Sequence, residues 1–205
     1  MYTGIVKEQL PISGIIKKEG LMTFSLEFPD YLLEGLELGG SIAINGVCFT
    51  VTNIDGNSVS FDAIRETLAL SNIKYLDIGS MVNVERSAKP DAEVGGHILS
   101  GHVISTATVS HIETTENNCR LTLSGESRWL KYVFEKGFLA VNGASLTVAK
   151  LERESESFCI NLIPETLKRT NFSCLSVGDE VNIEVESQTQ VIVDTVERVL
   201  AENYQ

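Results

Sequence analysis

The chain contains an internal duplication, and this repeat constrains its possible folds more than any other feature. Segments of the first half recur in the second half in the same order, which is the signature of a duplicated structural unit. Asn45 corresponds to Asn142 at an offset of 97 residues, and Asn83 corresponds to Asn182 at an offset of 99. The matched segments are 4–6 with 101–103, 45–51 with 142–148, 65–72 with 164–171, and 79–85 with 178–184.

A single loop insertion explains why the offset changes. The turn at Asp55–Asn57 corresponds to the longer stretch Arg153–Ser157, and hairpin loops tolerate insertions. A period near 100 residues is too long for one unit of a solenoid. The repeat therefore predicts two domains of the same fold, at residues 1–96 and 97–187, followed by a tail at 188–205.

Within each repeat the pattern predicts β-structure. Asn45-Gly46 and Asp55-Gly56 separate short segments rich in β-branched and aromatic residues, and these dipeptides favour tight hairpins. Many short strands at regular spacing favour a small closed barrel, since closure removes exposed sheet edges. The fold class is therefore all-β, with short helices expected only at residues 29–36, 66–70, 127–136 and 165–170.

The tail has a different periodicity. Ile192, Val196 and Val199 follow helical spacing, as do Val193, Val196 and Leu200. An apolar stripe on a helix needs a partner, which could be its own barrel or copies of the helix from other subunits.

Composition excludes several classes of protein. The net charge of −12 disfavours nucleic acid and anionic membranes as partners, because both are bound by clustered Lys and Arg. The N-terminus lacks a signal-peptide pattern, and no apolar run approaches the roughly 18 residues of a membrane span. The four cysteines show no C-x-x-C spacing, which favours reduced thiols in a cytoplasmic protein.

Two of the three histidines lie close together, at His97 and His102. Metal binding would require further ligands at close spacing, so no metal site is predicted. His102 corresponds to Ile5 in the repeat, and this divergence suggests that the two halves have different tasks. A histidine can exchange a proton near neutral pH, although a structural, hydrogen-bonded role stays open. His111 stands alone, as expected for a surface or structural residue.

Cys48 corresponds to Ser145 in the repeat, and each follows an Asn-Gly turn. A thiol and a hydroxyl are both candidate nucleophiles or proton relays, whereas a small buried cysteine is the alternative for Cys48. Nearby polar side chains suit a polyhydroxylated ligand, or they reflect the ordinary Ser and Thr content of strands. They are Ser41, Thr50, Asp62, Thr67, Thr147 and Thr166. No phosphate-binding glycine motif occurs.

These motifs together resemble the trimeric, two-barrel riboflavin synthase family. The resemblance extends from Met1 to about Leu200, and its most specific segments are 1–6, 45–51, 95–103, 143–148 and 163–167. It implies two six-stranded Greek-key β-barrels and a C-terminal trimerisation helix. It also implies a transferase without cofactor that converts two molecules of 6,7-dimethyl-8-ribityllumazine to riboflavin and 5-amino-6-ribitylaminouracil.

The resemblance also implies which residues form the sites. We expect the first-barrel pocket to use Gly4, Ile5, Val6, Ser41, Cys48, Phe49, Thr50, Asp62, Ala63, Ile64, Arg65, Glu66, Thr67, Gly101, His102 and Val103. We expect the second-barrel pocket to use Lys136, Ser145, Leu146, Thr147, Leu162, Ile163, Pro164, Glu165, Thr166 and Leu167. The implied catalytic residues are His102, Ser145, Cys48, Ser41, Lys136 and Glu186.

Within this set, His102 and Ser145 would handle protons at the acidic 7-methyl group, and Cys48 or a water would add to the acceptor ring. The family's productive site lies between the first barrel of one subunit and the second barrel of a neighbour. Two homologous pockets would hold two identical substrates, and such positioning can supply up to about 7–11 kcal/mol of the barrier reduction.

Three residues depart from the family pattern. Tyr2 replaces the usual Phe, Asn142 replaces an Asp, and Glu186 replaces a catalytic Asp with a side chain that is one methylene longer.

Two other functions are compatible with parts of this pattern. Lumazine proteins of luminous bacteria share the fold and act as optical antennas, but they typically lose the second-barrel residues and the histidine at position 102. A flavin-barrel oxidoreductase module would need a following nicotinamide domain, for which this sequence leaves no residues. Association with lumazine synthase is a further partner that the family resemblance suggests.

Overall fold

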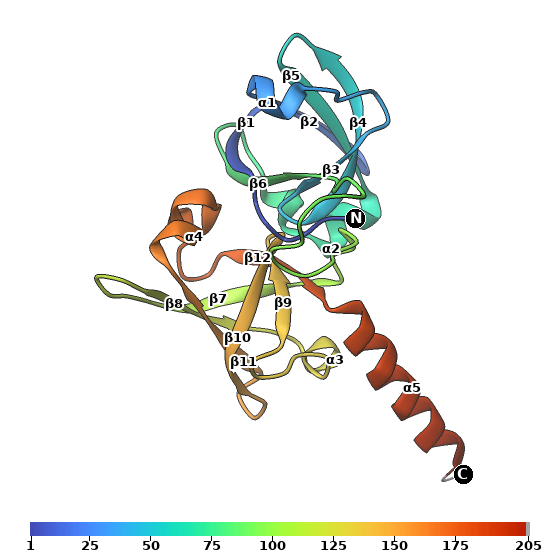
Figure 1. The fold of residues 1–205 in the computed structure, drawn as a ribbon, viewed down its shortest axis with the longest axis vertical. Coiled ribbons are helices and arrows are strands. Elements are labelled where there is room, and N and C mark those ends of the chain that lie inside the picture. Colours follow the sequence, from blue (N-terminus) through green and yellow to red (C-terminus); the bar gives the residue numbers. More distant parts are fainter. Residues whose placement is uncertain (204–205) are drawn as a thin grey trace.

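The computed structural model describes residues 1–203 and contains two closed antiparallel barrels of six strands each, followed by a long helix (Figure 1). This confirms the all-β fold class with a C-terminal helix. The first barrel consists of β1 (Glu8–Lys18), β2 (Leu21–Glu27), β3 (Ser41–Ile44), β4 (Val47–Asp55), β5 (Ser58–Ile64) and β6 (Met81–Arg86). The second consists of β7 (Ser105–Thr114), β8 (Cys119–Ser124), β9 (Phe138–Val141), β10 (Ala144–Glu152), β11 (Ser157–Leu162) and β12 (Glu180–Val185).

Both barrels have the same Greek-key strand order. The first runs β1-β2-β5-β4-β3-β6 around the barrel. The second gives the same cycle when β7 to β12 replace β1 to β6 in sequence order. The sequence repeat is therefore a repeat of complete barrels, and the inserted residues fall in the β10–β11 hairpin loop, as predicted.

The two Asn-Gly turns join β3 to β4 and β9 to β10, and they lie back to back where the barrels meet. Asn45 and Gly46 both have positive φ angles, of 46° and 79°, and Asn142 and Gly143 have 44° and 79°. A Cβ atom on Gly46 would lie 2.6 Å from the backbone nitrogen of Gly143, and one on Gly143 would lie 2.7 Å from that of Gly46. Glycine is therefore required here by backbone angle and by close approach.

Short helices occur where the sequence predicted them, with two of the four shorter than expected. The predicted ranges 29–36 and 127–136 form single turns, because these segments soon continue into loops that lead to β3 and β9. The helices are α1 (Asp30–Leu33), α2 (Arg65–Leu70), α3 (Ser127–Leu130) and α4 (Pro164–Arg169), with 3-10 turns η1 (Asn72–Tyr75) and η2 (Asn171–Cys174).

Each barrel encloses its own apolar core. In the first, the rings of Phe24 and Phe49 meet edge to face with centroids 5.1 Å apart. In the second, Trp129 and Phe158 pack in the same way at 6.0 Å. Inward-facing residues alternate with outward-facing ones along the strands, as a small barrel filled by side chains requires.

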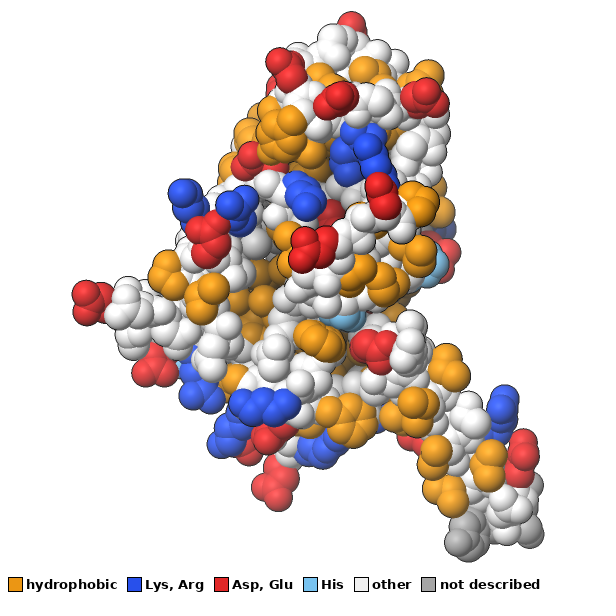
Figure 2. Space-filling model, in the orientation of Figure 1, with side chains coloured by type: hydrophobic (Ala, Val, Ile, Leu, Met, Phe, Trp, Pro, Cys, Tyr) orange, Lys and Arg blue, Asp and Glu red, His pale blue; other side chains and the backbone are white. Residues whose placement is uncertain are grey.

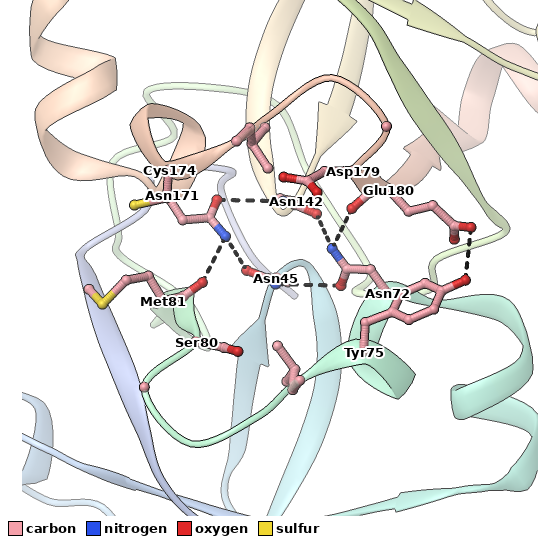
Figure 3. A pocket seen from close by; sticks show the side chains of 14 residues that line it. Asn45, Asn72, Tyr75, Ser80, Met81, Asn142, Asn171, Cys174, Asp179 and Glu180 are labelled. Atoms are coloured by element: carbon pink, nitrogen blue, oxygen red, sulfur yellow. Dashed lines mark hydrogen bonds between the residues drawn. The ribbon is translucent and has the colours of Figure 1, made fainter.

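Among the described residues, six asparagines connect the barrels through a network with approximate twofold symmetry. Figure 3 shows four of them, Asn45, Asn72, Asn142 and Asn171. Asn72 donates to the side-chain oxygen of Asn142 at 3.1 Å, and the equivalent Asn171 donates to that of Asn45, also at 3.1 Å. The backbone nitrogen of Asn72 also donates to Asn182 at 2.6 Å, and that of Asn171 donates to Asn83 at 2.7 Å. Asn142 takes part as an amide donor towards Asn171, which the usual Asp could not do.

The last helix, α5 (Ser187–Asn203), extends away from both barrels (Figure 1). None of its side chains is buried, and Ile192, Val196 and Leu200 are at least half exposed. Figure 2 shows hydrophobic side chains on the exposed surface of this helix. Lys131 and Tyr132 contact Asp194, and Lys131 also contacts Glu197, so polar side chains join the helix to the second barrel. The exposure of the apolar stripe shows that it does not pack on the chain's own barrel. No helix within residues 1–203 is long and apolar enough to span a membrane.

Candidate functional site

The segments that precede the two barrels exchange places. Val6 is buried in the core of the second barrel, whereas Lys7 already pairs with Val84 of the first barrel. Val103, which is equivalent to Val6, packs against the core of the first barrel. We call residues 2–6 the first arm and residues 99–103 the second arm, and each arm crosses to the other barrel.

This crossing corrects the predicted grouping of the site residues. Gly4–Val6 were expected in the first-barrel pocket, but the carbonyl of Gly4 accepts a 2.8 Å hydrogen bond from the backbone of Ser145 on β10. Gly101–Val103 were expected at the first barrel, and there the carbonyl of Gly101 accepts from the backbone of Cys48 at 2.9 Å. The repeat could not reveal the exchange, because the sequence offsets are the same whichever barrel an arm covers.

The first arm and the second barrel enclose a cavity of about 280 Å³. Most of its lining residues belong to the predicted set, but Leu162 is fully buried in the barrel core, so its side chain does not reach the cavity. The lining consists of Gly4, Ile5, Val6, Ala144, Ser145, Leu146, Glu165, Thr166, Arg169 and Thr170.

Ser145 has a histidine partner at this cavity. Nδ1 of His97 lies 2.6 Å from Oγ of Ser145. The His97 ring stacks on Phe138, with centroids 5.1 Å apart and planes inclined by 18°. Its other nitrogen, Nε2, is buried without a hydrogen-bond partner among the described residues. A serine beside an imidazole is an arrangement that can pass a proton to or from a bound molecule.

The electrostatic surroundings favour the neutral form of His97. Burial lowers the pKa of His97 below its ordinary value, and the carboxylate of Glu186 opposes this by raising it. Burial would raise the pKa of Glu186, but hydrogen bonds from Thr189 and Gln188 outweigh this effect and lower it. Glu186 thus caps the start of α5, accepting from the Thr189 hydroxyl at 2.6 Å, and also acts on His97.

Sequence reasoning did not identify His97 as the partner of Ser145. The repeat singled out His102 because His102 replaces an aliphatic counterpart, whereas the position equivalent to His97 would precede Met1. His102 lies instead on the second arm beside Cys48, and its side chain is exposed. Within one chain, His102 and Ser145 belong to pockets of different barrels.

On the first-barrel side, Cys48 has a partner that the sequence did not predict. The hydroxyl of Tyr2 is buried and donates to the Cys48 sulfur at 3.0 Å. Burial raises the pKa of Tyr2 strongly, so the hydroxyl stays protonated as a donor. Phe49, by contrast, points into the core beside Phe24.

Three other predicted residues have different neighbours. Ser41 pairs with Thr50 across β3 and β4, and Asp62 accepts from Thr23 at 2.5 Å. Lys136 is exposed and has a positive φ of 65°. No hydrogen bond within residues 1–203 joins any of these side chains to Ser145 or Cys48.

A larger cleft of about 700 Å³ lies between the barrels, but its chemistry is different (Figure 3). Four asparagines of the network line it, together with residues such as Tyr75 and Glu180, which hydrogen bond to each other. None of the predicted catalytic residues lines it. The arms, Cys48 and the Ser145–His97 pair therefore define the candidate site.

Comparisons with known proteins agree on both the fold and the repeat. Residues 3–87 and 100–186 each match the lumazine binding domain family. The riboflavin synthase of Escherichia coli (strain K12) is 48% identical over 202 residues, covering 98% of this chain and 94% of that protein. That of Chlamydia pneumoniae is 36% identical, and the match covers 98% of both chains.

Solved structures of a related binding protein have the same fold. The crystal structure of LumP complexed with riboflavin superposes with a TM-score of 0.85 at 25% identity, covering 91% of this chain and 100% of that one. LumP complexed with 6,7-dimethyl-8-(1'-D-ribityl) lumazine gives a TM-score of 0.82.

Two barrels with exchanged arms, each matching the lumazine binding domain, define this chain as a tandem lumazine-binding protein. Its similarity to enzymes of that class extends over nearly the whole sequence. The chain belongs to the riboflavin synthase family.

Proposed function

We propose that this chain catalyses the dismutation of two 6,7-dimethyl-8-ribityllumazine molecules. One molecule donates a four-carbon unit, made of its two ring carbons and their methyl groups, and leaves as 5-amino-6-ribitylaminouracil. The other accepts the unit and becomes riboflavin. Donor and acceptor start as the same compound and the electrons balance between them, so the overall reaction needs no external oxidant or reductant.

The observation that carries this proposal is the hydrogen bond between His97 and Ser145 at the cavity of the second barrel, in a chain whose barrel is present twice. A reaction between two identical molecules needs two similar binding sites and one group that moves a proton. The neutral imidazole of His97 can accept a proton through the Ser145 hydroxyl, and the 7-methyl group of a lumazine is the acidic position that would supply it.

The two pockets would have different tasks because their polar groups differ. The second-barrel pocket has the Ser145–His97 pair, which suits proton removal from the donor. The first-barrel pocket has Cys48, held by Tyr2, and His102 nearby, which suits addition to the acceptor ring by the thiol or by a water. Ser41, Lys136 and Glu186 keep the supporting catalytic roles expected from the sequence.

The proposal includes a homotrimer in which the first barrel of one subunit faces the second barrel of its neighbour. The exposed apolar stripe of α5 supports this, since such a stripe is stabilised by packing against copies of itself. The assembly would also bring His102 of one subunit to Ser145 of the next, as the predicted shared proton transfer requires.

The test is purified protein incubated with the lumazine alone. We expect flavin absorbance to appear, with one riboflavin formed for every two lumazines consumed. Ser145→Ala should reduce turnover by about 10²–10⁴-fold, the range for loss of a general acid–base group. A His102→Gln variant with full turnover would remove His102 from the mechanism, and absence of turnover by the unmodified protein would reject the proposal.

An antenna function is the second candidate, supported by the structural similarity to LumP bound to riboflavin. The same assay separates the two candidates, because an antenna would bind the lumazine and fluoresce without forming riboflavin. The enzyme is favoured because the chain keeps both Ser145 and His102.

Location and further partners complete the proposal. We place the protein in the cytoplasm, which is consistent with four free cysteines at Cys48, Cys119, Cys159 and Cys174. Association with lumazine synthase stays a prediction, and copurification of the two proteins would test it.

A further inference from the structure

Two buried carboxylates outside the proposed catalytic set occupy equivalent places in the two barrels. Glu85 lies at the end of β6 with 4% of its surface exposed, and Glu184 lies on β12 with 6% exposed. Within residues 1–203, neither carboxylate has a cation within salt-bridge distance. Burying an unpaired charge is costly unless hydrogen bonds compensate for it, so the partners of these groups indicate their purpose.

Among residues 1–203, the hydrogen bonds to Glu85 all come from the first arm. Its Oε1 atom accepts from the backbone nitrogen and from the hydroxyl of Thr3, both at 2.7 Å, and its Oε2 atom accepts from the nitrogen of Gly4 at 3.1 Å. The Thr3 hydroxyl in turn accepts from the nitrogen of Ile5 at 3.3 Å. Glu85 therefore fixes three consecutive residues of an arm that covers the second barrel.

Glu184 repeats this arrangement on the second arm. Its Oε1 atom accepts from the backbone nitrogen and the hydroxyl of Ser100, both at 2.7 Å, and its Oε2 atom accepts from Gly101 at 3.1 Å. The Ser100 hydroxyl accepts from the nitrogen of His102 at 3.3 Å. Glu184 therefore orients the segment that presents His102.

In each arm, the glycine that the carboxylate holds also contacts the other barrel. Gly4 and Gly101 have φ angles of 72° and 82°, and their carbonyls accept from Ser145 and Cys48 at 2.8 and 2.9 Å. The carboxylate that holds an arm thus belongs to one barrel, while the pocket that the arm completes belongs to the other.

We propose that Glu85 and Glu184 are crossed positioning residues: Glu85 of the first barrel organises the pocket around Ser145, and Glu184 of the second barrel organises the pocket around Cys48. Burial raises the pKa of Glu85, and the hydrogen bonds from Thr3 and Gly4 offset this rise only in part. Each barrel would then bind a ligand in its own pocket only when the other barrel is folded and holds the arm in place.

Amide hydrogen exchange of the full chain tests this directly, with Glu85→Gln and Glu184→Gln as controls for each other. A Gln side chain keeps one acceptor oxygen and turns the other into a donor that faces an N–H group. We expect Glu85→Gln to speed exchange at the Ser145 amide at least tenfold and to leave the Cys48 amide within twofold of the unmodified protein. Glu184→Gln should do the reverse. Equal acceleration at both amides, acceleration only within the mutated barrel, or no acceleration would overturn the proposal.

A second pair of variants decides the matter if the Gln variants do not fold. Thr3→Val removes the hydroxyl that links Glu85 to Ile5, whereas Thr3→Ser keeps it. We expect faster exchange at Ser145 for Thr3→Val and normal exchange for Thr3→Ser, with Ser100→Ala and Ser100→Thr giving the equivalent result at Cys48. Identical behaviour within each pair would reject the hydroxyl link.

The catalytic consequence rests on the proposed function, and the exchange experiment does not. Thr3→Val should lower lumazine turnover at least fivefold, and Thr3→Ser should restore it. If the unmodified chain does not turn over lumazine, the proposed reaction fails, while the exchange results still test the crossed positioning.

Discussion

His97 and Ser145 are 48 residues apart in the sequence, yet their side chains meet with Nδ1 and Oγ 2.6 Å apart. The contact forms because Gly96, next to His97, lies so close to Ser145 that a Cβ atom on it would be 2.6 Å from the serine Cβ. The segment between the barrels thus places the imidazole of His97 beside Ser145 of the second barrel. The two barrels therefore differ at the position where we propose that the chemistry occurs.

The first prediction concerns the pH dependence of activity. Burial lowers the pKa of His97, so its neutral, basic form should persist below the ordinary histidine pKa of about 6.5. We expect the acid limb of the kcat/KM profile to lie below that value, because this limb reports the essential base of the free enzyme. An acid limb above pH 6.5, or one that is unchanged in His97→Gln, would contradict the assignment.

A related prediction concerns Glu186, which raises the pKa of His97. Glu186→Gln removes the carboxylate charge, so the pKa of His97 should fall further and the acid limb should move to lower pH. Glu116→Gln is the matched control, since it removes an exposed carboxylate from a distant loop and should leave the limb in place. The pKa of His97 also affects stability. Because the folded state lowers this pKa, neutral His97 contributes to the free energy of unfolding above the pKa of the unfolded state, and the contribution is lost as pH falls through the folded pKa.

The fold was largely predictable because its information is local and present twice. Asn-Gly turns with positive φ recur at Asn45 and Asn142, and the inserted residues fall in a hairpin loop. The arrangement of the site was less predictable. Repeat offsets cannot show which barrel Gly4 covers, and His97 has no counterpart with which to compare it. The His97–Ser145 contact and the crossing of the arms depend on how the two barrels pack in three dimensions. A comparison of the two sequence repeats contains no information on that packing.

The back-to-back turns provide a prediction about stability. Gly143→Ala would combine a positive φ with a Cβ placed 2.7 Å from the Gly46 nitrogen, whereas Gly35 has a similar φ of 64° and nothing within 4 Å of such a Cβ. We expect Gly35→Ala to lower the free energy of unfolding by about 1 kcal/mol. Gly143→Ala should cost about 1–3 kcal/mol more, from overpacking. Urea denaturation measures both, and equal losses would show that the turns do not constrain the interface.

The asparagine network predicts a symmetric pair of effects. Asn72 donates to Asn142 and to the carbonyl of Glu180, and Asn171 donates to Asn45 and to the carbonyl of Met81. Replacing either donor by Ala removes two hydrogen bonds from the buried network, although Asn142 still accepts from Asn182 and Asn45 still accepts from Asn83. Losing these bonds should cost about 1–3 kcal/mol. We expect Asn72→Ala and Asn171→Ala to lose similar amounts in urea denaturation. A loss confined to one variant would mean that the two barrels depend on the network unequally.

The last prediction concerns α5 and the proposed trimer. Val196 is 51% exposed on the apolar stripe, so a lysine there would be harmless in a monomer but would place a charge inside a helix bundle. We expect Val196→Lys to shift the protein from trimer to monomer in analytical ultracentrifugation and to lower turnover, because the proposed site is completed by a neighbouring subunit. Glu202→Gln makes the same change in net charge outside the stripe and should remain trimeric. A monomeric unmodified protein that still turns over lumazine would refute the shared site. A trimer that survives Val196→Lys would place its interface elsewhere.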